Sequence, residues 1–161
     1  MDSRRTTLSG GYLLREAEEH DIGAIVALLA ADPLRAGDEQ AGSEGREEYL
    51  RAFRAIRADP AHILVVVADD DRVVGTLQLT LLPGLARGGA TRLQVEAVRV
   101  AEDVRSRGIG AEMIRWAAEE GRRRGAALVQ LTSDARRTDA HRFYGRLGFE
   151  QSHVGFKLPL E

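Results

Sequence analysis

The amino-acid sequence predicts an α/β domain built on a mixed β-sheet. Segments with a strand-like apolar pattern and segments with helical apolar spacing follow one another along the 161 residues, and no repeat, linker or change in composition divides them. The length is that of about one domain with its own core. Hydrophobic residues make up 43% and charged residues 30% of the chain, which is typical of a globular protein and not of a disordered one.

The first ten residues, MDSRRTTLSG, are polar and are predicted to form a flexible tail before a single domain over residues 11–161. No secretory hydrophobic region follows them, and no apolar run approaches the length of about 18 residues that a membrane helix needs. The chain has no cysteine, which excludes disulfides, thiolate metal sites and a covalent cysteine mechanism. We therefore expect a cytoplasmic protein without membrane contact.

The first half of the domain is predicted to contain one strand and two helices. The strand covers residues 12–17, and Asp21 then has the character of an N-cap for a helix that Asp32-Pro33 ends. Residues 34–46 are rich in Gly, Asp, Glu and Ser without apolar periodicity, so they predict a loop. A second helix follows over residues 47–58.

The second half begins with a β-hairpin over residues 63–68 and 72–82, around the turn Asp69-Asp70-Asp71. A third strand is predicted over residues 91–100 and a helix over residues 108–124, which Gly125 stops. The remaining predicted elements are a buried strand from residue 126, a helix over 138–147, and one or two strands within 149–160.

The stretch VRSRGIGAEM, residues 104–113, places two arginines and two glycines where a predicted strand passes into a helix. The first N–H groups of a helix have no internal partner and attract anions. Gly108 and Gly110 would let a phosphate approach the main chain, and Arg105 and Arg107 add positive charge. Alone, the pattern fits a tight loop equally well. The stretch lacks the Gly-Lys-Ser/Thr of a Walker loop and the third glycine of a dinucleotide-binding fingerprint.

A second motif, AHRFYGRLGFE, follows at residues 140–150. With both motifs at this spacing, the chain from about Tyr12 onward resembles the GNAT superfamily of N-acetyltransferases. In that family the signature Gln/Arg-x-x-Gly-x-Gly/Ala, which reads Arg105 to Gly110 here, binds the pyrophosphate of acetyl-CoA. The second signature stands as Ala140, Phe143, Tyr144, Gly148 and Phe149. The resemblance implies the GNAT fold, a mixed central sheet with helices on both faces.

The resemblance also implies the reaction, in which an acetyl group moves from acetyl-CoA to a primary amine of a small molecule or protein by direct attack in a ternary complex. The cofactor-binding residues that it assigns are Val98, Arg99, Val100, Arg105, Ser106, Arg107, Gly108, Ile109, Gly110, Ala111, Arg137 and Tyr144. The first three would act through their main chain, where the strand splays from its neighbour at a β-bulge. Arg137 stands where many members carry asparagine, so it either reaches a cofactor phosphate or an acidic partner residue, or is exposed to solvent.

Glu96 and Tyr144 are the candidate catalytic residues. Glu96 lies at the position of a strand carboxylate that serves many family members as general base, and strand alternation puts it on one face with Val98 and Val100, where it is expected to be partly desolvated. The alternative role for Glu96 is an ion pair with an arginine on the neighbouring strand. The resemblance places the Tyr144 hydroxyl near the sulfur of CoA as proton donor, and the alternative for Tyr144 is a core aromatic residue.

Two other functions compete with acetyl transfer. One is a catalytically silent acyl-CoA-binding or sensor domain of the same fold, which the presence of both Glu96 and Tyr144 disfavours. The other is a nucleic-acid-associated protein, which the net charge of −2 and the 5% aromatic content disfavour. The four histidines show no metal-ligand spacing, so no metal is expected.

The amine acceptor stays open at this level. Asp38, Glu39 and Glu44 in the predicted loop would favour a cationic amine, or they belong to a merely polar loop. Small polyamine-like molecules, aminoglycosides, amino acids and protein amines all remain candidates. The resemblance also allows a homodimer.

Overall fold

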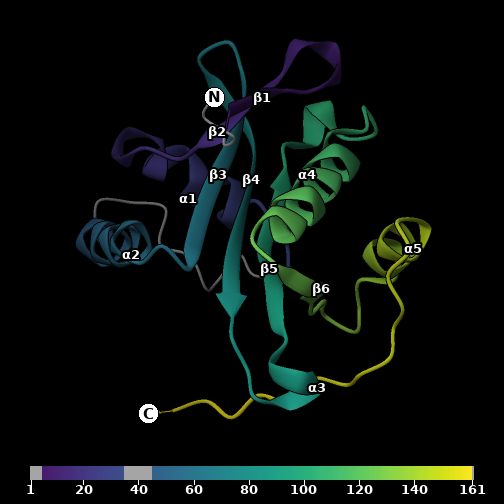
Figure 1. Ribbon diagram of the computed structural model, residues 1–161. Helices are drawn as coiled ribbons and strands as arrows, with labels where there is room; N and C mark the ends of the chain where they lie inside the picture. Colours follow the sequence, from purple (N-terminus) through teal and green to yellow (C-terminus); the bar gives the residue numbers. More distant parts are fainter. Residues whose placement is uncertain (1–4, 35–44, 161) are drawn as a thin grey trace. The chain divides into compact units, whose positions relative to one another are not determined.

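The computed structural model describes residues 5–34 and 45–160 of the chain (Figure 1). The chain divides into two compact units, Met1–Gln130 and Leu131–Glu161, where the sequence predicted one domain over residues 11–161. The strands are β1 (Arg5–Thr7), β2 (Leu13–Glu16), β3 (His62–Asp69), β4 (Arg72–Leu82), β5 (Thr91–Val100) and β6 (Ala126–Leu131). The helices are α1 (Ile22–Ala30), α2 (Arg46–Ala58), α3 (Ala86–Gly89), α4 (Ile109–Arg123) and α5 (Thr138–Arg146).

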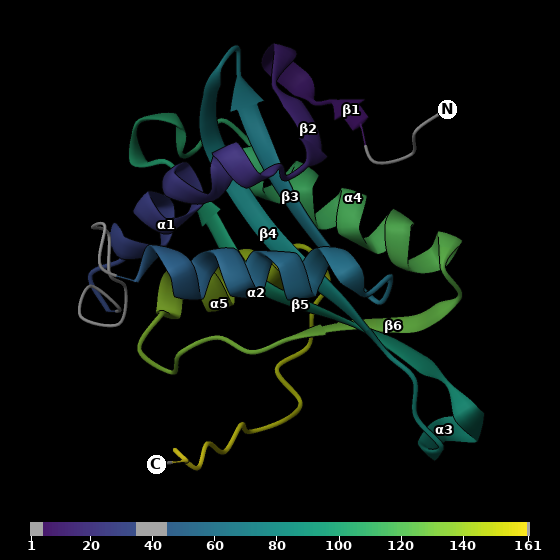
Figure 2. The ribbon, with the colours of Figure 1, turned by 90° about the vertical axis from the view of Figure 1, so that its left-hand side faces the viewer.

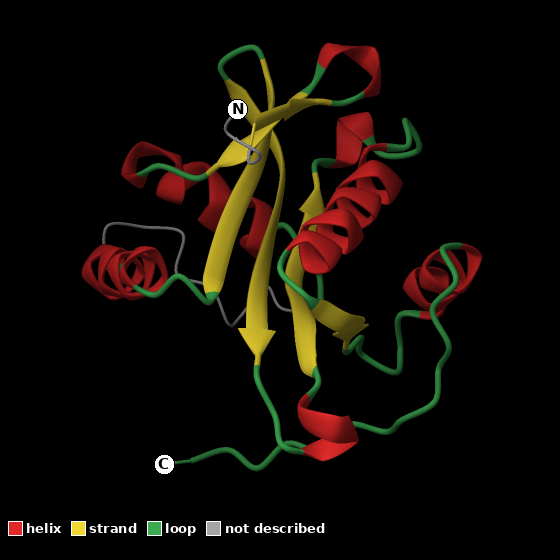
Figure 3. Ribbon diagram, viewed as in Figure 1, coloured by secondary structure: helices red, strands yellow, loops and turns green. Residues whose placement is uncertain are grey.

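The strands form one sheet in the order β1-β2-β3-β4-β5-β6 (Figure 3). Each of the first four strands pairs antiparallel with the next, and the hairpin of β3 and β4 turns at Asp70, whose φ of 50° is left-handed. The helix α4 connects β5 to β6, a crossover of the kind that parallel neighbours need. The predicted hairpin, third strand and long helix are therefore confirmed.

Helices cover both faces of the sheet in the first unit. Figure 2 shows α1 and α2 in front of the sheet with α4 behind it. On the α1 and α2 side, a core cluster joins Ala17, Ile25, Phe53 and Val66. On the α4 side, a Cβ at Gly121 would come within 3.1 Å of the Leu93 side chain, so the helix packs closely on β5. The expected mixed sheet with helices on both faces is confirmed.

The two ends of the chain differ from the prediction. Residues 5–7 form β1, which pairs with β2, and a one-turn helix follows over Ser9–Gly11, so the predicted tail over residues 1–10 is wrong from residue 5 onward. Polar side chains suit this edge strand because its residues are exposed. Residues 149–160 form no strand although their apolar residues alternate, because a strand needs a hydrogen-bonding neighbour as well as a pattern.

Two further results concern regions that the sequence analysis singled out. The acidic residues Asp38, Glu39 and Glu44 of the predicted loop lie outside the described residues. None of the helices within residues 5–34 and 45–160 has the length and apolar character that crossing a membrane requires.

Candidate functional site

The strand β5 contains a β-bulge at the position where the resemblance places one. Glu96 lies opposite Gln78 of β4 and Arg99 lies opposite Thr76, so Ala97 and Val98 together oppose a single residue. Ala97 has a φ of 53°, a left-handed conformation that costs a non-glycine residue about 1 kcal/mol or more. A bulge leaves backbone groups out of the ladder. These groups of β5 are therefore available to a ligand at the middle of the sheet.

The bulge changes which side chains share a face of the sheet. Cross-strand partners lie on the same face of a sheet. Thr76 and Gln78 are two residues apart on β4 and share a face, so their partners Arg99 and Glu96 share that face too. Strict alternation had put Arg99 on the opposite face and Val98 beside Glu96, and this prediction is wrong. The extra residue of the bulge shifts the phase of every residue after it.

Arg99 connects the bulge to the end of α1. Its Nη2 donates to Asp32 Oδ2 at 2.8 Å, and its Nη1 donates to the Val98 carbonyl oxygen at 2.8 Å. The Asp32 side chain is only 4% exposed, so this ion pair is shielded from solvent. The resemblance assigns the main chain of Arg99 to cofactor binding. The structure adds a role for its side chain, which holds the bulge against Asp32.

Glu96 is exposed on the face of the sheet that α1 and α2 cover elsewhere. The expected partial desolvation is therefore wrong for this residue. Within the described part of the chain, its carboxylate makes no ion pair, and its partner on β4 is Gln78 rather than an arginine. The alternative role of a cross-strand ion pair is thereby removed, and the carboxylate is accessible for proton transfer.

The loop between β5 and α4 leaves backbone N–H groups and open space at the beginning of the helix. Ser106 and Gly108 in this loop have left-handed φ values of 67° and 84°. The first hydrogen bond of α4 runs from the Glu112 N–H to the Gly108 carbonyl at 3.1 Å. The N–H groups of residues 109–111 thus belong to the unpaired first turn. A Cβ at Gly108 would meet no protein atom within 4 Å, so space is open beside it.

The two arginines of this loop are each held by one hydrogen bond. Arg105 Nε donates to the Val100 carbonyl oxygen at 3.1 Å, which joins the loop to the end of β5. Arg107 Nη1 donates to the Tyr12 hydroxyl at 3.0 Å. Both arginines are exposed, and a guanidinium has five donors, so most of their donors remain for phosphate oxygens. The loop therefore fits a diphosphate in both backbone geometry and charge.

Contacts distant in sequence anchor the same loop. Arg72, at the start of β4, donates from Nη1 and Nη2 to both carboxylate oxygens of Asp103 at 2.6 and 2.8 Å. These hydrogen bonds lower the pKa of Asp103. The Ser9 N–H donates to Glu112 Oε2 at 2.9 Å at the beginning of α4. Sequence reasoning missed Tyr12, Arg72 and Asp103, because no local pattern signals contacts between residues 31 to 103 positions apart.

Replacing Gly108 by alanine tests whether the loop holds the diphosphate. The left-handed φ should cost about 1 kcal/mol of stability for any L side chain. A Cβ there would also keep a phosphate from one N–H group, and losing one charge-assisted hydrogen bond raises the KM for acetyl-CoA about tenfold. Steady-state kinetics and calorimetric titration with acetyl-CoA measure this effect.

Gly88→Ala is the matched control for that substitution. Gly88 has a φ of 70° and open space around its missing Cβ, but it lies in the turn between β4 and β5. Both variants should lose similar stability, and only Gly108→Ala should lose affinity for acetyl-CoA. Equal affinities in the two variants would contradict the assignment of the loop.

The remaining predicted residues, Arg137 and Tyr144, belong to the second unit. The Tyr144 ring on α5 makes edge contacts with Phe143 and Phe149, at centroid distances of 5.1 and 5.7 Å. Arg137 immediately precedes α5, and its N–H donates to the Asp134 carbonyl at 2.9 Å. The predicted site residues thus form two groups: Glu96, Val98 to Val100 and residues 105–111 in the first unit, and Arg137 and Tyr144 in the second.

The part of the chain that the structure describes contains no group of three or more His, Cys, Asp or Glu residues arranged to hold a metal ion. His141, which lies beside the tyrosine motif, has its Nε2 2.9 Å from the Asp134 carbonyl oxygen. This histidine therefore has a local partner within its own unit.

Comparison with known proteins identifies the family. A model of the acetyltransferase (GNAT) family matches residues 30–149. An aminoalkylphosphonate N-acetyltransferase from Salmonella typhimurium is 32% identical over 147 residues, which cover 91% of this chain and 90% of that protein. A solved structure of a transcriptional regulator from Bacillus halodurans C-125 is 39% identical with a TM-score of 0.88, covering 91% of this chain and 98% of that one.

A solved glucosamine-6-phosphate N-acetyltransferase from Arabidopsis thaliana shares the fold with a TM-score of 0.77 at 18% identity, covering 93% of this chain and 99% of that one. The bulge of β5 and the anion-binding loop before α4 lie within the part of the chain that the family model matches. Since the model matches well over half of the chain and the Salmonella relative aligns along nearly its full length, the chain belongs to the acetyltransferase (GNAT) family and is an acetyl-CoA-dependent N-acetyltransferase.

Proposed function

We propose that the protein acetylates a primary amine by direct attack in a ternary complex with acetyl-CoA. The observation that carries this proposal is the bulge of β5, in the strand that leads to the unpaired N–H groups at the beginning of α4. The chain has no cysteine for a covalent acyl-enzyme. Because the bulge lies in β5 and the loop follows that strand, the proposal puts the phosphates at the loop and the thioester beside Glu96.

In this proposal the N–H groups of residues 108–111, together with Arg105 and Arg107, hold the diphosphate. Main-chain groups of residues 98–100 align the thioester arm along β5. The Val98 and Val100 carbonyls already accept from Arg99 and Arg105, but each carbonyl oxygen has a second lone pair. Arg137 is included among the cofactor-binding residues because a cation before a helix is electrostatically unfavourable unless an anion lies nearby.

The chemistry requires nitrogen to lose two protons and sulfur to gain one. An alkylamine with a pKa near 10 arrives protonated, so Glu96, directly or through a water molecule, takes the first proton from it. The nitrogen lone pair then forms the C–N bond to the acetyl carbonyl, the nitrogen releases its second proton to solvent, and the C–S bond breaks with its electron pair on sulfur. On the family resemblance, the Tyr144 hydroxyl donates a proton to this sulfur and regains one from solvent.

Replacing Tyr144 by phenylalanine tests the proton donor. The ring contacts with Phe143 and Phe149 need no hydroxyl, so the fold should be kept. Loss of a general acid should lower kcat about 100-fold with an unchanged KM for acetyl-CoA. Tyr12→Phe is the control, because that hydroxyl contacts Arg107 and its loss should affect the KM for acetyl-CoA instead. A normal kcat in Tyr144→Phe would show that Tyr144 is an aromatic packing residue.

The acceptor is the finer part of the proposal. The Salmonella relative acts on aminoalkylphosphonates, so we propose small aminoalkylphosphonates as the first acceptors to test. Polyamine-like molecules, aminoglycosides, amino acids and protein amines complete the panel. Release of CoA and mass detection of the acetylated amine measure the reaction. Tight binding of acetyl-CoA with no acetylated product from any amine would favour the silent sensor domain instead.

A further inference from the structure

A row of polar side chains crosses four strands on the face of the sheet that carries Glu96. We call the four residues His62, Thr80, Gln94 and Gln130 the polar row; they lie on β3, β4, β5 and β6. His62 is the register partner of Thr80, and Thr80 is the partner of Gln94. His62 Nδ1 lies 3.0 Å from Thr80 Oγ1, and Gln130 Nε2 donates to Gln94 Oε1 at 2.8 Å.

The polar row is a specific arrangement and not a solvated surface. All four side chains are half-buried, whereas Ile63, Leu79 and Leu93 on the opposite face are fully buried. A half-buried row of amides and hydroxyls on a sheet is able to hydrogen-bond a polar ligand lying across it. The row therefore extends the candidate site from Glu96 across the sheet.

Two opposite charges flank the polar row on β5. Arg92 and Glu96 lie two residues before and two residues after Gln94, so all three share one face. Arg92 Nη1 donates to Gln130 Oε1 at 3.5 Å, which brings the guanidinium to the end of the row. Among the described residues, neither Arg92 nor Glu96 has an oppositely charged group within ion-pair distance. Each charge therefore remains available for a ligand of opposite sign.

We infer that Arg92, supported by Gln130 and Gln94, binds an anionic group of the amine acceptor and thereby determines acceptor specificity. This inference rests on the proposed function, which places the amine at Glu96. The Cα atoms of Arg92 and Glu96 are about 13 Å apart along the strand, on the same face and on either side of Gln94. The interval between them suits a small molecule that carries an amine at one end and a phosphonate, phosphate or carboxylate at the other.

Arginine suits this task because its planar guanidinium binds two oxygens of one anion at once. The hydrogen bond to Gln130 orients the guanidinium, and the Gln94 amide fixes Gln130 in turn. An acceptor with both charges would be oriented with its amine toward Glu96. An amine that lacks the anionic group would lose this orientation. An Arg92→Lys variant would keep the positive charge but lose the paired hydrogen bonds of the guanidinium.

The test compares two acceptors of matched length, (2-aminoethyl)phosphonate and ethanolamine. Native enzyme should use the phosphonate with the higher kcat/KM. Arg92→Gln should lower kcat/KM for the phosphonate about 30-fold, the loss expected for a charge-assisted hydrogen bond, and leave ethanolamine within about twofold. Arg92→Lys should restore part of the loss. Arg87→Gln is the control, because Arg87 is exposed in the turn between β4 and β5. β-Alanine as a third acceptor separates phosphonate from carboxylate recognition.

A binding measurement keeps this inference distinct from the proposed function. Titration of (2-aminoethyl)phosphonate into the native protein with CoA present should show saturable binding that Arg92→Gln weakens. If neither acceptor is acetylated but this binding difference is found, the proposed reaction fails and the anion site stands. Equal use of both acceptors by native enzyme, equal losses for both in Arg92→Gln, or phosphonate binding that Arg92→Gln leaves unchanged would overturn the inference.

Discussion

Replacement of Glu96 by glutamine is expected to lower kcat about 100-fold, with little change in the KM for acetyl-CoA. The amide keeps the size of the side chain but cannot take a proton from the incoming ammonium group. Glu96 is exposed, is opposite Gln78 and makes no ion pair within the described residues, so the substitution removes no structural contact. Steady-state kinetics with the best acceptor of the amine panel measure the effect.

The split between kcat and KM separates a base from a merely binding carboxylate. In Glu96→Gln the loss of a base lowers kcat, whereas the loss of a binding contact raises the KM for the amine. Glu119→Gln is the control, because Glu119 is an exposed residue of α4 whose contact is a surface pair with Arg122. An unchanged kcat in Glu96→Gln would assign the proton transfer to another group.

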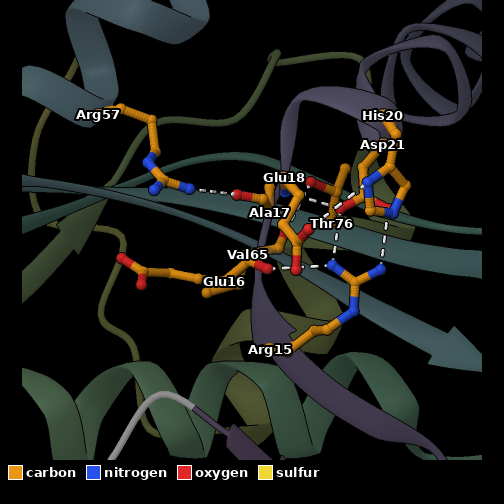
Figure 4. A network of polar contacts seen from close by, with 9 residues as sticks. All are labelled: Arg15, Glu16, Ala17, Glu18, His20, Asp21, Arg57, Val65 and Thr76. Atoms are coloured by element: carbon orange, nitrogen blue, oxygen red, sulfur yellow. Dashed lines mark hydrogen bonds and ion pairs between the residues drawn. The ribbon is translucent and has the colours of Figure 1, made fainter. Parts of the chain in front are cut away.

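Replacement of Asp21 by asparagine is expected to cost about 3 kcal/mol of unfolding free energy at pH 7. Asp21 is 2% exposed, and Arg15 donates to its two oxygens at 2.7 and 2.9 Å (Figure 4). The Glu18 N–H donates to the same carboxylate at 2.8 Å. The sequence predicted Asp21 as an N-cap of α1, but its side chain makes no cap hydrogen bond there and joins β2 to the start of the helix instead. Urea unfolding measures the loss.

The cost of this substitution should depend on pH. Burial of the carboxylate acts to raise the pKa of Asp21, but hydrogen bonds from Arg15 and Glu18 outweigh it, and the net pKa is lowered. A lowered folded pKa means that the stabilisation is complete above the unfolded value near 4 and is lost as the pH falls through the folded value. The difference between native protein and Asp21→Asn should therefore shrink below about pH 4.

His20 also lies near this carboxylate, with its ring nitrogen Nε2 3.5 Å from Asp21 Oδ1. His20→Gln serves as the control, because its side chain is 69% exposed and its contact should contribute little to stability. An Asp21→Asn variant with native unfolding free energy at pH 7 would show that the network around Asp21 is not a source of stability. A loss that does not diminish in acid would show that the charge of Asp21 does not carry this stabilisation.

The sequence by itself determined the local elements and the loop before α4. Apolar periodicity located the hairpin, β5 and α4, because these segments bury the face that their pattern displays. Glycines and arginines at the beginning of α4 were sufficient to predict the loop, since left-handed φ values and unpaired helix N–H groups are local properties.

Tertiary structure alone decided how the site is put together. The bulge forms at Ala97, a non-glycine residue in a strained conformation, so the residue type gives no indication of it. The bulge places Arg99 on the same face of the sheet as Glu96. The polar row and the contacts of Arg107 with Tyr12 and of Arg72 with Asp103 join segments far apart in the chain. Such contacts depend on strand register and packing, and a one-dimensional pattern carries no information about the register of one strand against another.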